Sequence, residues 1–187
     1  MLPIPQIALA AALLLVASGA APAQSFQASS VDLPEGAPIA QKFTYQGFGC
    51  RGNNLSPALA WTNAPAGTRS FAVSVHDPDA PTGGAGFWHW LVIDLPASAS
   101  GLPQGSGAAD GKALPAPARQ LASDFGTPGW GGPCPPAGDK PHHYVFTVYA
   151  LSVAKLDVPA NASASLAAAS AERHALAKAS FTRLYGR

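Results

Sequence analysis

The sequence predicts a mainly β domain with one α-helix near its C-terminus. Three observations lead to this prediction. Several segments are rich in β-branched and aromatic residues, an Ala-rich stretch near the end has helical spacing, and Gly and Pro, 19 of each among 187 residues, interrupt the rest. So much Pro excludes a coiled coil or a long helical bundle, because Pro breaks an α-helix.

Three segments give the clearest strand signals. Residues 70–75 place apolar side chains on one face by alternation. Residues 90–93 form a short continuous apolar run, which indicates a strand covered on both faces. Residues 144–151 are β-branched and aromatic almost throughout and form the strongest candidate. Residues 42–45 and 59–61 are shorter candidates.

The helix is expected over residues 163–181. This stretch is rich in Ala, and Leu166, Ala169, Ala177 and Phe181 lie near helical spacing. Residues 161–163, Asn-Ala-Ser, spell a formal glycosylation sequon, but they are expected to begin the helix, because Asn and Ser are favoured at helix starts. The expected arrangement is a β domain with this helix packed on it.

Charge is scarce and nearly balanced. Only 11% of residues are charged, where roughly 25% is usual, and the formal net charge is +1. Binding to nucleic acid is not expected, because affinity for a phosphate backbone requires clustered Lys and Arg. Disorder is not expected either, since 48% of residues are hydrophobic.

Residues 1–23 are expected to be a signal peptide. Residues 7–17 form an apolar run of suitable length, and residues 21–23, Ala-Pro-Ala, offer small residues at both recognition positions for a cut after Ala23. The alternative is an uncleaved anchor, although the run is shorter than the roughly 20 residues that a membrane span needs. The expected product is a single domain, 24–187, that is periplasmic or secreted and has no stable membrane insertion.

The chain has two cysteines, Cys50 and Cys134. In an exported protein they are expected to form one disulfide, and two free thiols are the alternative. The bond would close a long loop, worth about 4–5 kcal/mol at most in the chain-entropy picture. A metal site built on this pair is not supported, because no C-x-x-C spacing occurs.

Residues whose side chains could take part in binding or catalysis lie at the ends of the predicted strands. Asp77 and Asp79 follow one strand, His89 opens the next, and His142 and Tyr144 open the strongest one. Long Gly/Pro-rich segments, 96–119 and 126–141, lie between strands, and such loops often carry a site. The ends of consecutive strands of one sheet can meet at one mouth, so these side chains are expected to converge there.

This set of residues suits an anion site. His titrates near neutrality, a neighbouring carboxylate fixes its tautomer, and Gly-rich backbone lets N–H groups approach an anion closely. A carboxylate that faced the anion would repel it, so at least one Asp is expected to hydrogen-bond a His or loop N–H groups instead. Pro81, Trp88 and Pro135 are expected to form an apolar rim.

Other readings of the same residues stay open at this point. The segment 77–81 can be a plain turn, because Asp and Pro are turn formers, and His89 and His142 can be satisfied core histidines. Asp77, Asp79, His89 and His142 can also bind a metal, which their spacing does not decide. A hydrolase is the main enzymatic alternative, although no G-x-S-x-G motif occurs.

The chain resembles the phosphatidylethanolamine-binding protein family, the Raf-kinase-inhibitor-like group, and most of all its bacterial branch. The matching stretches, in order, are Asn54-Leu55-Ser56-Pro57 with Trp61, Ala64-Pro65-Ala66-Gly67-Thr68, Asp77-Pro78-Asp79-Ala80-Pro81, Trp88-His89-Trp90, Asp124-Phe125-Gly126, Gly132-Pro133-Cys134-Pro135-Pro136 and His142-His143-Tyr144. Each piece is weak alone, but their order and spacing over nearly all of 40–187 are specific. The sequence departs from the family pattern at Ser123, Trp130 and His143.

The resemblance implies a β-sandwich-like fold whose C-terminal helix lies beside a small anion pocket. It also implies a cis peptide bond, most plausibly Ala80–Pro81. Members of the family are described as binding phospholipid headgroups or phosphorylated groups, and some inhibit kinases or proteases. The pocket residues that the resemblance implies are Asp77, Asp79, His89, Gly132, Pro135, His142 and Tyr144.

The sequence therefore predicts a non-enzymatic, exported binding protein without a cofactor or metal. Its partner would be a small anionic or phosphorylated ligand, and the alternative is a protein target, a protease or kinase, held by the same rim. Binding is expected to strengthen as pH falls through the titration of the histidines. The expected ligand-binding residues are Asp77, Asp79, Pro81, Trp88, His89, Gly132, Pro135, His142 and Tyr144.

Overall fold

The computed structural model describes residues 24–187, and the expected signal peptide, 1–23, lies outside them. The elements in chain order are β1 (Gln27–Ser29), the 3₁₀ turn η1 (Gln41–Phe43), β2 (Gln46–Gly47), β3 (Cys50–Arg51), β4 (Leu59–Thr62), β5 (Ser70–Asp77), β6 (Phe87–Pro96), β7 (Gly101–Leu102), β8 (Arg119–Gln120), β9 (His142–Leu151), α1 (Ala164–His174) and β10 (Ala175–Tyr185). The expected mainly β fold with one C-terminal helix is confirmed.

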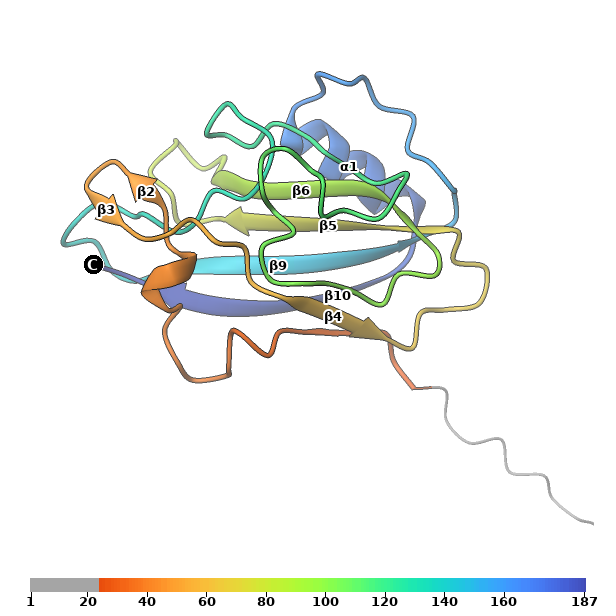
Figure 1. Ribbon diagram of the computed structural model, residues 1–187, viewed down its shortest axis with the longest axis horizontal. Helices are drawn as coiled ribbons and strands as arrows, with labels where there is room; N and C mark the ends of the chain where they lie inside the picture. The colour runs from red at the N-terminus through yellow and green to blue at the C-terminus, as the bar shows by residue number, and fades with distance from the viewer. Residues whose placement is uncertain (1–23) are drawn as a thin grey trace, which may run out of the picture.

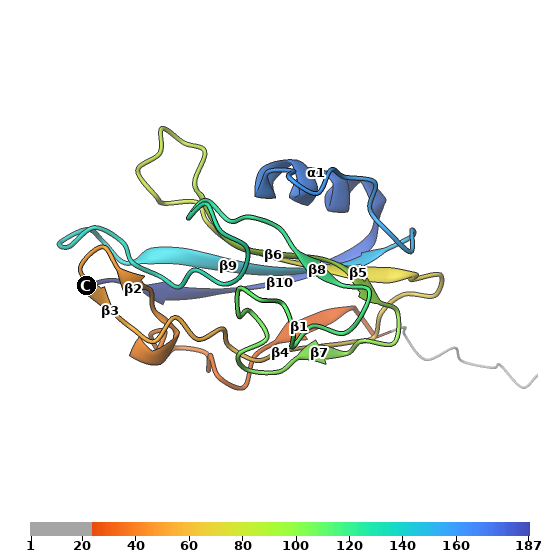
Figure 2. The same ribbon diagram turned by 45° about the horizontal axis from the view of Figure 1, so that its top comes forward.

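The described chain forms three layers around a central antiparallel sheet. That sheet has five strands in the order β10-β9-β5-β6-β8, and a smaller sheet, β1-β4-β7, covers one of its faces. Helix α1 covers part of the opposite face (Figure 2). The short β2–β3 hairpin stands apart from both sheets, at one end of the long strands (Figure 1).

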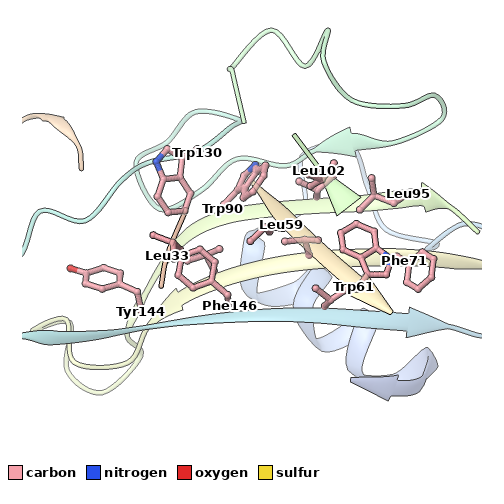
Figure 3. Packing of buried hydrophobic residues seen from close by; sticks show 14 of the residues in the cluster. Leu33, Leu59, Trp61, Phe71, Trp90, Leu95, Leu102, Trp130, Tyr144 and Phe146 are labelled. Atoms are coloured by element: carbon pink, nitrogen blue, oxygen red, sulfur yellow. The ribbon is translucent and has the colours of Figure 1, made fainter. Parts of the chain in front are cut away.

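Two hydrophobic clusters fill the spaces between these layers. Trp90 and Val92 of β6 point into the cluster between the two sheets, which Figure 3 shows, whereas Leu91 and Ile93 point into the cluster under α1. All four side chains are fully buried. The prediction that residues 90–93 form a strand covered on both faces is therefore confirmed.

The other strand predictions are mostly confirmed as well. Residues 59–61, 70–75 and 144–151 lie in β4, β5 and β9. The strand expected over 42–45 is wrong, because the chain there makes the turn η1. The Thr44 hydroxyl donates to the Gln41 carbonyl at 2.8 Å and closes this turn.

The predicted helix is correct in its first half and wrong in its second. It begins as expected, since the Ser163 hydroxyl accepts a hydrogen bond from the Leu166 N–H at 3.2 Å. It ends at His174, and the chain continues as β10, which pairs with β9 along its whole length. The Phe181 ring stacks on Phe146 of β9 with centroids 4.9 Å apart. Pairing with an otherwise open strand outweighs the helix propensity of the Ala-rich sequence.

The ends of three central strands meet at the same end of the molecule as the β2–β3 hairpin. Strand β5 ends there, and β6 and β9 begin there (Figure 1). The predicted disulfide between Cys50 and Cys134 is confirmed and links the hairpin to the loop that precedes β9. This is the arrangement in which the predicted site residues could converge.

Candidate functional site

A pocket of about 200 Å³ opens where these strand ends meet. Most of its wall is apolar, and its polar groups come from β5, β6 and β9. The lining residues are Phe48, Asp77, Ala80, Pro81, Thr82, Phe87, His89, Phe125, Cys134, Pro135, Pro136, His142 and Tyr144. Six of the nine residues expected from the sequence are among them: Asp77, Pro81, His89, Pro135, His142 and Tyr144.

A buried carboxylate–imidazole pair forms one side of the pocket. Asp77, at the end of β5, and His142, at the start of β9, are 3% and 5% exposed. His142 Nδ1 lies 2.8 Å from Asp77 Oδ2. Asp77 Oδ1 accepts a hydrogen bond from the Asp79 N–H at 2.9 Å. The carboxylate is thus committed to protein donors, which is how the sequence argument expected an Asp to sit beside an anion.

His89 forms the second polar group, and its tautomer is fixed. Its Nδ1 lies 2.6 Å from the Gly131 carbonyl oxygen, which can only accept, so Nδ1 carries the proton. Burial lowers the pKa of the His89 imidazole to about 4. The ring is therefore neutral at pH 7, and its Nε2 presents a lone pair. The expectation that a His89 cation attracts an anion near neutral pH is corrected by this burial.

Tyr144 supplies a hydroxyl without a partner. The side chain is fully buried, and its Oη makes no hydrogen bond with any group in residues 24–187. Burial, and next the charge and the close approach of the Asp77 carboxylate, raise the pKa of this hydroxyl above its usual range, so it stays protonated, although its geometry toward Asp77 does not make a hydrogen bond. Figure 3 shows the hydroxyl directed away from the other labelled core side chains. Buried polar groups are nearly always paired, so this hydroxyl is an unusual donor that an acceptor could bind.

Aromatic rings form the apolar rim. Phe87 and Phe125 meet edge to face with centroids 4.8 Å apart, and Phe125 stacks on Tyr45 at 4.2 Å. Phe48, at the tip of the β2–β3 hairpin, is 77% exposed although it lies 5.6 Å from the Tyr45 ring. None of these rings was expected in the site from the sequence. Phe87 could have been predicted as a pocket residue, because it lies two residues before His89 and its side chain therefore points to the same face of the strand.

Trp88 lies outside the pocket, on the other face of the central sheet. Its ring packs at a tilt against His76, with centroids 4.3 Å apart, and contacts the cluster under α1. The cause is a β-bulge. Val75 pairs with Trp90 and His76 pairs with Trp88, so His89 is the extra residue. A bulge reverses the alternation of side chains on either side of it, which turns His89 inward and Trp88 outward.

Gly132 and its neighbour do not offer N–H groups to an anion. The Gly132 N–H donates to Asn54 Oδ1 at 2.7 Å, and the Gly131 N–H donates to the His89 carbonyl at 2.9 Å. Gly132 is needed for another reason, because a Cβ there would collide with the Phe43 carbonyl. The expected backbone anion cradle is therefore corrected: these glycines allow close packing of the pocket wall.

Asp79 also lies outside the lining and acts on the turn that borders the pocket. Its Oδ2 accepts from the His143 N–H and lies 2.7 Å from the His143 ring Nδ1, and both hydrogen bonds lower the pKa of Asp79. The expected cis bond at Ala80–Pro81 is absent, and the cis bond in 24–187 is Ala116–Pro117. The Thr82 N–H instead donates to the Ala80 carbonyl, a tight turn that the fixed φ of Pro81 permits.

The remaining expectations concern a metal and the helix. In residues 24–187 no three His, Cys, Asp or Glu side chains are grouped so that they could hold a metal ion. Asp77 and His142 bind each other, and Asp79 binds His143, so the four candidate ligands do not converge. Helix α1 covers the face of the sheet away from the pocket and contributes no lining residue, which corrects its expected place beside the pocket.

Comparisons with known proteins agree with this architecture. Residues 29–186 match the phosphatidylethanolamine-binding protein family. The chain belongs to this family. It is 46% identical to the UPF0098 protein YbcL of Escherichia coli K12 over 165 residues, 88% of this chain and 90% of that protein. The crystal structure of E. coli YbcL, described as a new member of the mammalian PEBP family, superposes with a TM-score of 0.83 over 87% of this chain and 98% of that one.

Two further relatives widen the comparison. The UPF0098 protein YbhB of E. coli K12 is 44% identical over 83% of this chain and 97% of its own. A Mycobacterium tuberculosis relative named as a lipoprotein, LppC, is 42% identical over 72% of this chain and 59% of its own. Within the described residues, no helix is both long and apolar enough to cross a bilayer. The resemblance inferred from the sequence motifs is confirmed at the level of the family.

Proposed function

We propose that the protein binds a small oxyanion, a phosphate or a phosphorylated headgroup, in the pocket between Asp77, His89, His142 and Tyr144. The observation that carries this proposal is the hydroxyl of Tyr144, a buried donor without a hydrogen-bond partner in a residue that lines the pocket. A buried donor left unpaired costs about 1–3 kcal/mol, and an anion oxygen is a strong acceptor that would remove this cost.

The aromatic rim suits the remainder of such a ligand. Phe48, Phe87 and Phe125 surround the opening, together with Pro81 and Pro135. A pocket that is mostly apolar, with a few polar groups at its base, is the usual form of a small-molecule site. The polar groups would hold the oxyanion, and the rings would contact the part of the ligand that carries it.

Binding fits the pocket better than catalysis. Hydrolysis by a nucleophile needs a hydroxyl or thiol within reach of a base. Among the lining residues, the Thr82 hydroxyl donates to the Gly86 carbonyl at 2.8 Å, Cys134 is held in the disulfide, and the raised pKa of Tyr144 keeps its hydroxyl protonated. The Asp77–His142 pair therefore has no free nucleophile to activate. We also propose that the protein acts outside the cytoplasm, which the disulfide, the apolar segment 7–17 and the lipoprotein relative support.

Isothermal titration calorimetry with inorganic phosphate and with phosphoethanolamine tests the proposal. Tyr144→Phe should weaken binding by about ten- to a hundredfold, the value of one hydrogen bond to a charged group. His89→Ala should also weaken it. The matched control is Tyr149→Phe, because the Tyr149 hydroxyl is likewise buried but contacts Ser74, away from the pocket. Equal affinity in wild type and both pocket variants would overturn the site.

A second candidate is docking of a protein partner, a protease or kinase, on the same rim. Phe48 favours it, because a ring that is 77% exposed beside a pocket is a typical contact residue. Phe48→Ser should then abolish stoichiometric capture of a partner from a periplasmic extract while phosphate binding stays the same. Loss of phosphate affinity alone would assign Phe48 to the small-molecule site.

A further inference from the structure

The pocket offers an oxyanion an unusual mixture of groups. No Lys or Arg is among its described lining residues. The nearby Arg187 is not among them, and its guanidinium donates to the Pro135 carbonyl at 2.7 Å and the Phe48 carbonyl at 3.2 Å. A ligand in the pocket therefore meets the unpaired Tyr144 hydroxyl and the imidazoles of His89 and His142, but no Lys or Arg side chain.

The second ring nitrogen of His89 is an acceptor rather than a donor. Nδ1 holds its proton against the Gly131 carbonyl at 2.6 Å, so a neutral His89 leaves the lone pair of Nε2 unused. The groups around the ring do not favour its charged form enough to offset burial. Asp77 and Asp124 favour the cation, His76 opposes it, and the Tyr144 ring packs against the imidazole with centroids 5.1 Å apart.

We infer that the pocket selects an oxyanion that carries its own proton, so that hydrogen phosphate binds and sulfate is rejected. The ligand P–OH would donate to His89 Nε2, and an ionised P–O⁻ would accept from the Tyr144 hydroxyl. Sulfate has no proton at neutral pH, so its oxygens would face the Nε2 lone pair and the nearby Asp77 carboxylate. This inference rests on the proposed function, because it specifies the ligand of that same site.

The physical basis of this selection is repulsion: in a closed pocket the lone pairs of a sulfate oxygen and of His89 Nε2 would face each other. A site that accepts a hydrogen bond from its ligand discriminates strongly against an analogue that lacks the proton, because a buried acceptor is then left unpaired or repelled. The preference for phosphate over sulfate falls when His89 is protonated, since its Nε2–H then donates a hydrogen bond to either anion. Acid should therefore admit sulfate, and binding of sulfate should take up a proton.

Calorimetric titration of the protein with inorganic phosphate and with sulfate, at pH 7 and pH 4.5, tests this inference. At pH 7 phosphate should bind about tenfold or more tightly than sulfate. At pH 4.5 the ratio should fall, and the heat of sulfate binding should change with the ionisation heat of the buffer. A ratio near one at pH 7 overturns the inference and leaves the proposed function standing.

Two variants separate the roles of His89 and Tyr144. In His89→Gln the side-chain amide can donate as well as accept, so the preference for phosphate at pH 7 should shrink toward one. Tyr144→Phe removes a donor that both anions would use, so both affinities should fall while their ratio is kept. An unchanged ratio in His89→Gln contradicts the inference. If neither anion binds wild-type protein at either pH, the proposed function is overturned, and the inference falls with it.

Discussion

Asp77 and His142 form a buried pair across two neighbouring strands, with Asp77 Oδ2 2.8 Å from His142 Nδ1. Neither side chain could be buried alone at low cost, because a lone carboxylate or a lone imidazolium pays a large desolvation penalty. The pair fixes the His142 ring so that Nδ1 faces the carboxylate and Nε2 faces away, 3.7 Å from Asp139 Oδ2. Asp77 is therefore a positioning residue for His142.

Asp77→Asn should test this role. The Asn amide can still accept from the Asp79 N–H, but it no longer presents a charged acceptor to His142 Nδ1. We expect the free energy of unfolding to fall by about 1–3 kcal/mol, the cost of losing a buried hydrogen bond to a charged group. Urea denaturation measures it. Asp79→Asn is the control, because the exposed pair Asp79–His143 should contribute under about 1 kcal/mol. Equal losses in the two variants would contradict the role assigned to Asp77.

His89 should make the folded protein sensitive to acid. Its pKa is about 4 when folded and 6.5 in its ordinary state, so between these pH values the unfolded chain binds more protons and stability falls as pH falls. The loss amounts to about 3 kcal/mol once pH is below both values. The Asp79 carboxyl, whose pKa is lowered by folding, adds a loss that begins near its unfolded pKa, at about pH 4.

Urea denaturation at pH 7 and pH 4.5 measures this dependence. His89→Gln should be less stable than wild type at pH 7, but its stability should fall much less between the two pH values, because Gln does not titrate. Asp79 changes little in this window, so it does not mask the difference. The same loss of stability on acidification in wild type and variant would exclude His89 as the acid-sensitive group.

The sequence allowed most of the central sheet to be predicted, but not the details that decide which side chains face the pocket. The period-two pattern of 70–75 and the continuous apolar run of 90–93 follow directly from burial on one or both faces, and both became strands. The bulge at His89 has no sequence signal, since it is defined by pairing with β5. For that reason Trp88 was expected on the rim and lies on the opposite face.

Two of the other corrections also depend on distant partners. Residues 175–181 favour a helix locally, and only the pairing of this segment with β9 makes it a strand. Gly132 fits an anion-binding loop by composition, but its N–H is occupied by Asn54, 78 residues away in sequence. Local sequence therefore identified the chemistry of the pocket and misplaced the residues whose orientation depends on long-range contacts.

Phe87 and Trp88 give a direct test of the bulge, because they are adjacent in sequence and lie on opposite faces. At about pH 5, where a phosphate monoester keeps one proton, phenyl phosphate should bind more tightly than inorganic phosphate, since its ring can pack on Phe87 and Phe125. Phe87→Ala should reduce this advantage by about fivefold, the value of roughly 1 kcal/mol of aromatic packing. Trp88→Phe should leave it unchanged. Calorimetry with both ligands decides, and a larger effect at Trp88 than at Phe87 would contradict the face assignment.

The disulfide should support both stability and the pocket, because it joins the hairpin that carries Phe48 to the wall that carries Pro135. It spans 84 residues of sequence. Replacing both cysteines by Ser should lower the free energy of unfolding by about 2–4 kcal/mol, since a long loop is freed in the unfolded chain. Phenyl phosphate should also bind less tightly, because Cys134 itself lines the pocket and the rim is no longer tethered. Titration of thiols in urea, before and after reduction, gives the control: wild-type protein should show free thiols only after reduction. An unchanged affinity in the double variant would limit the disulfide to a role in stability.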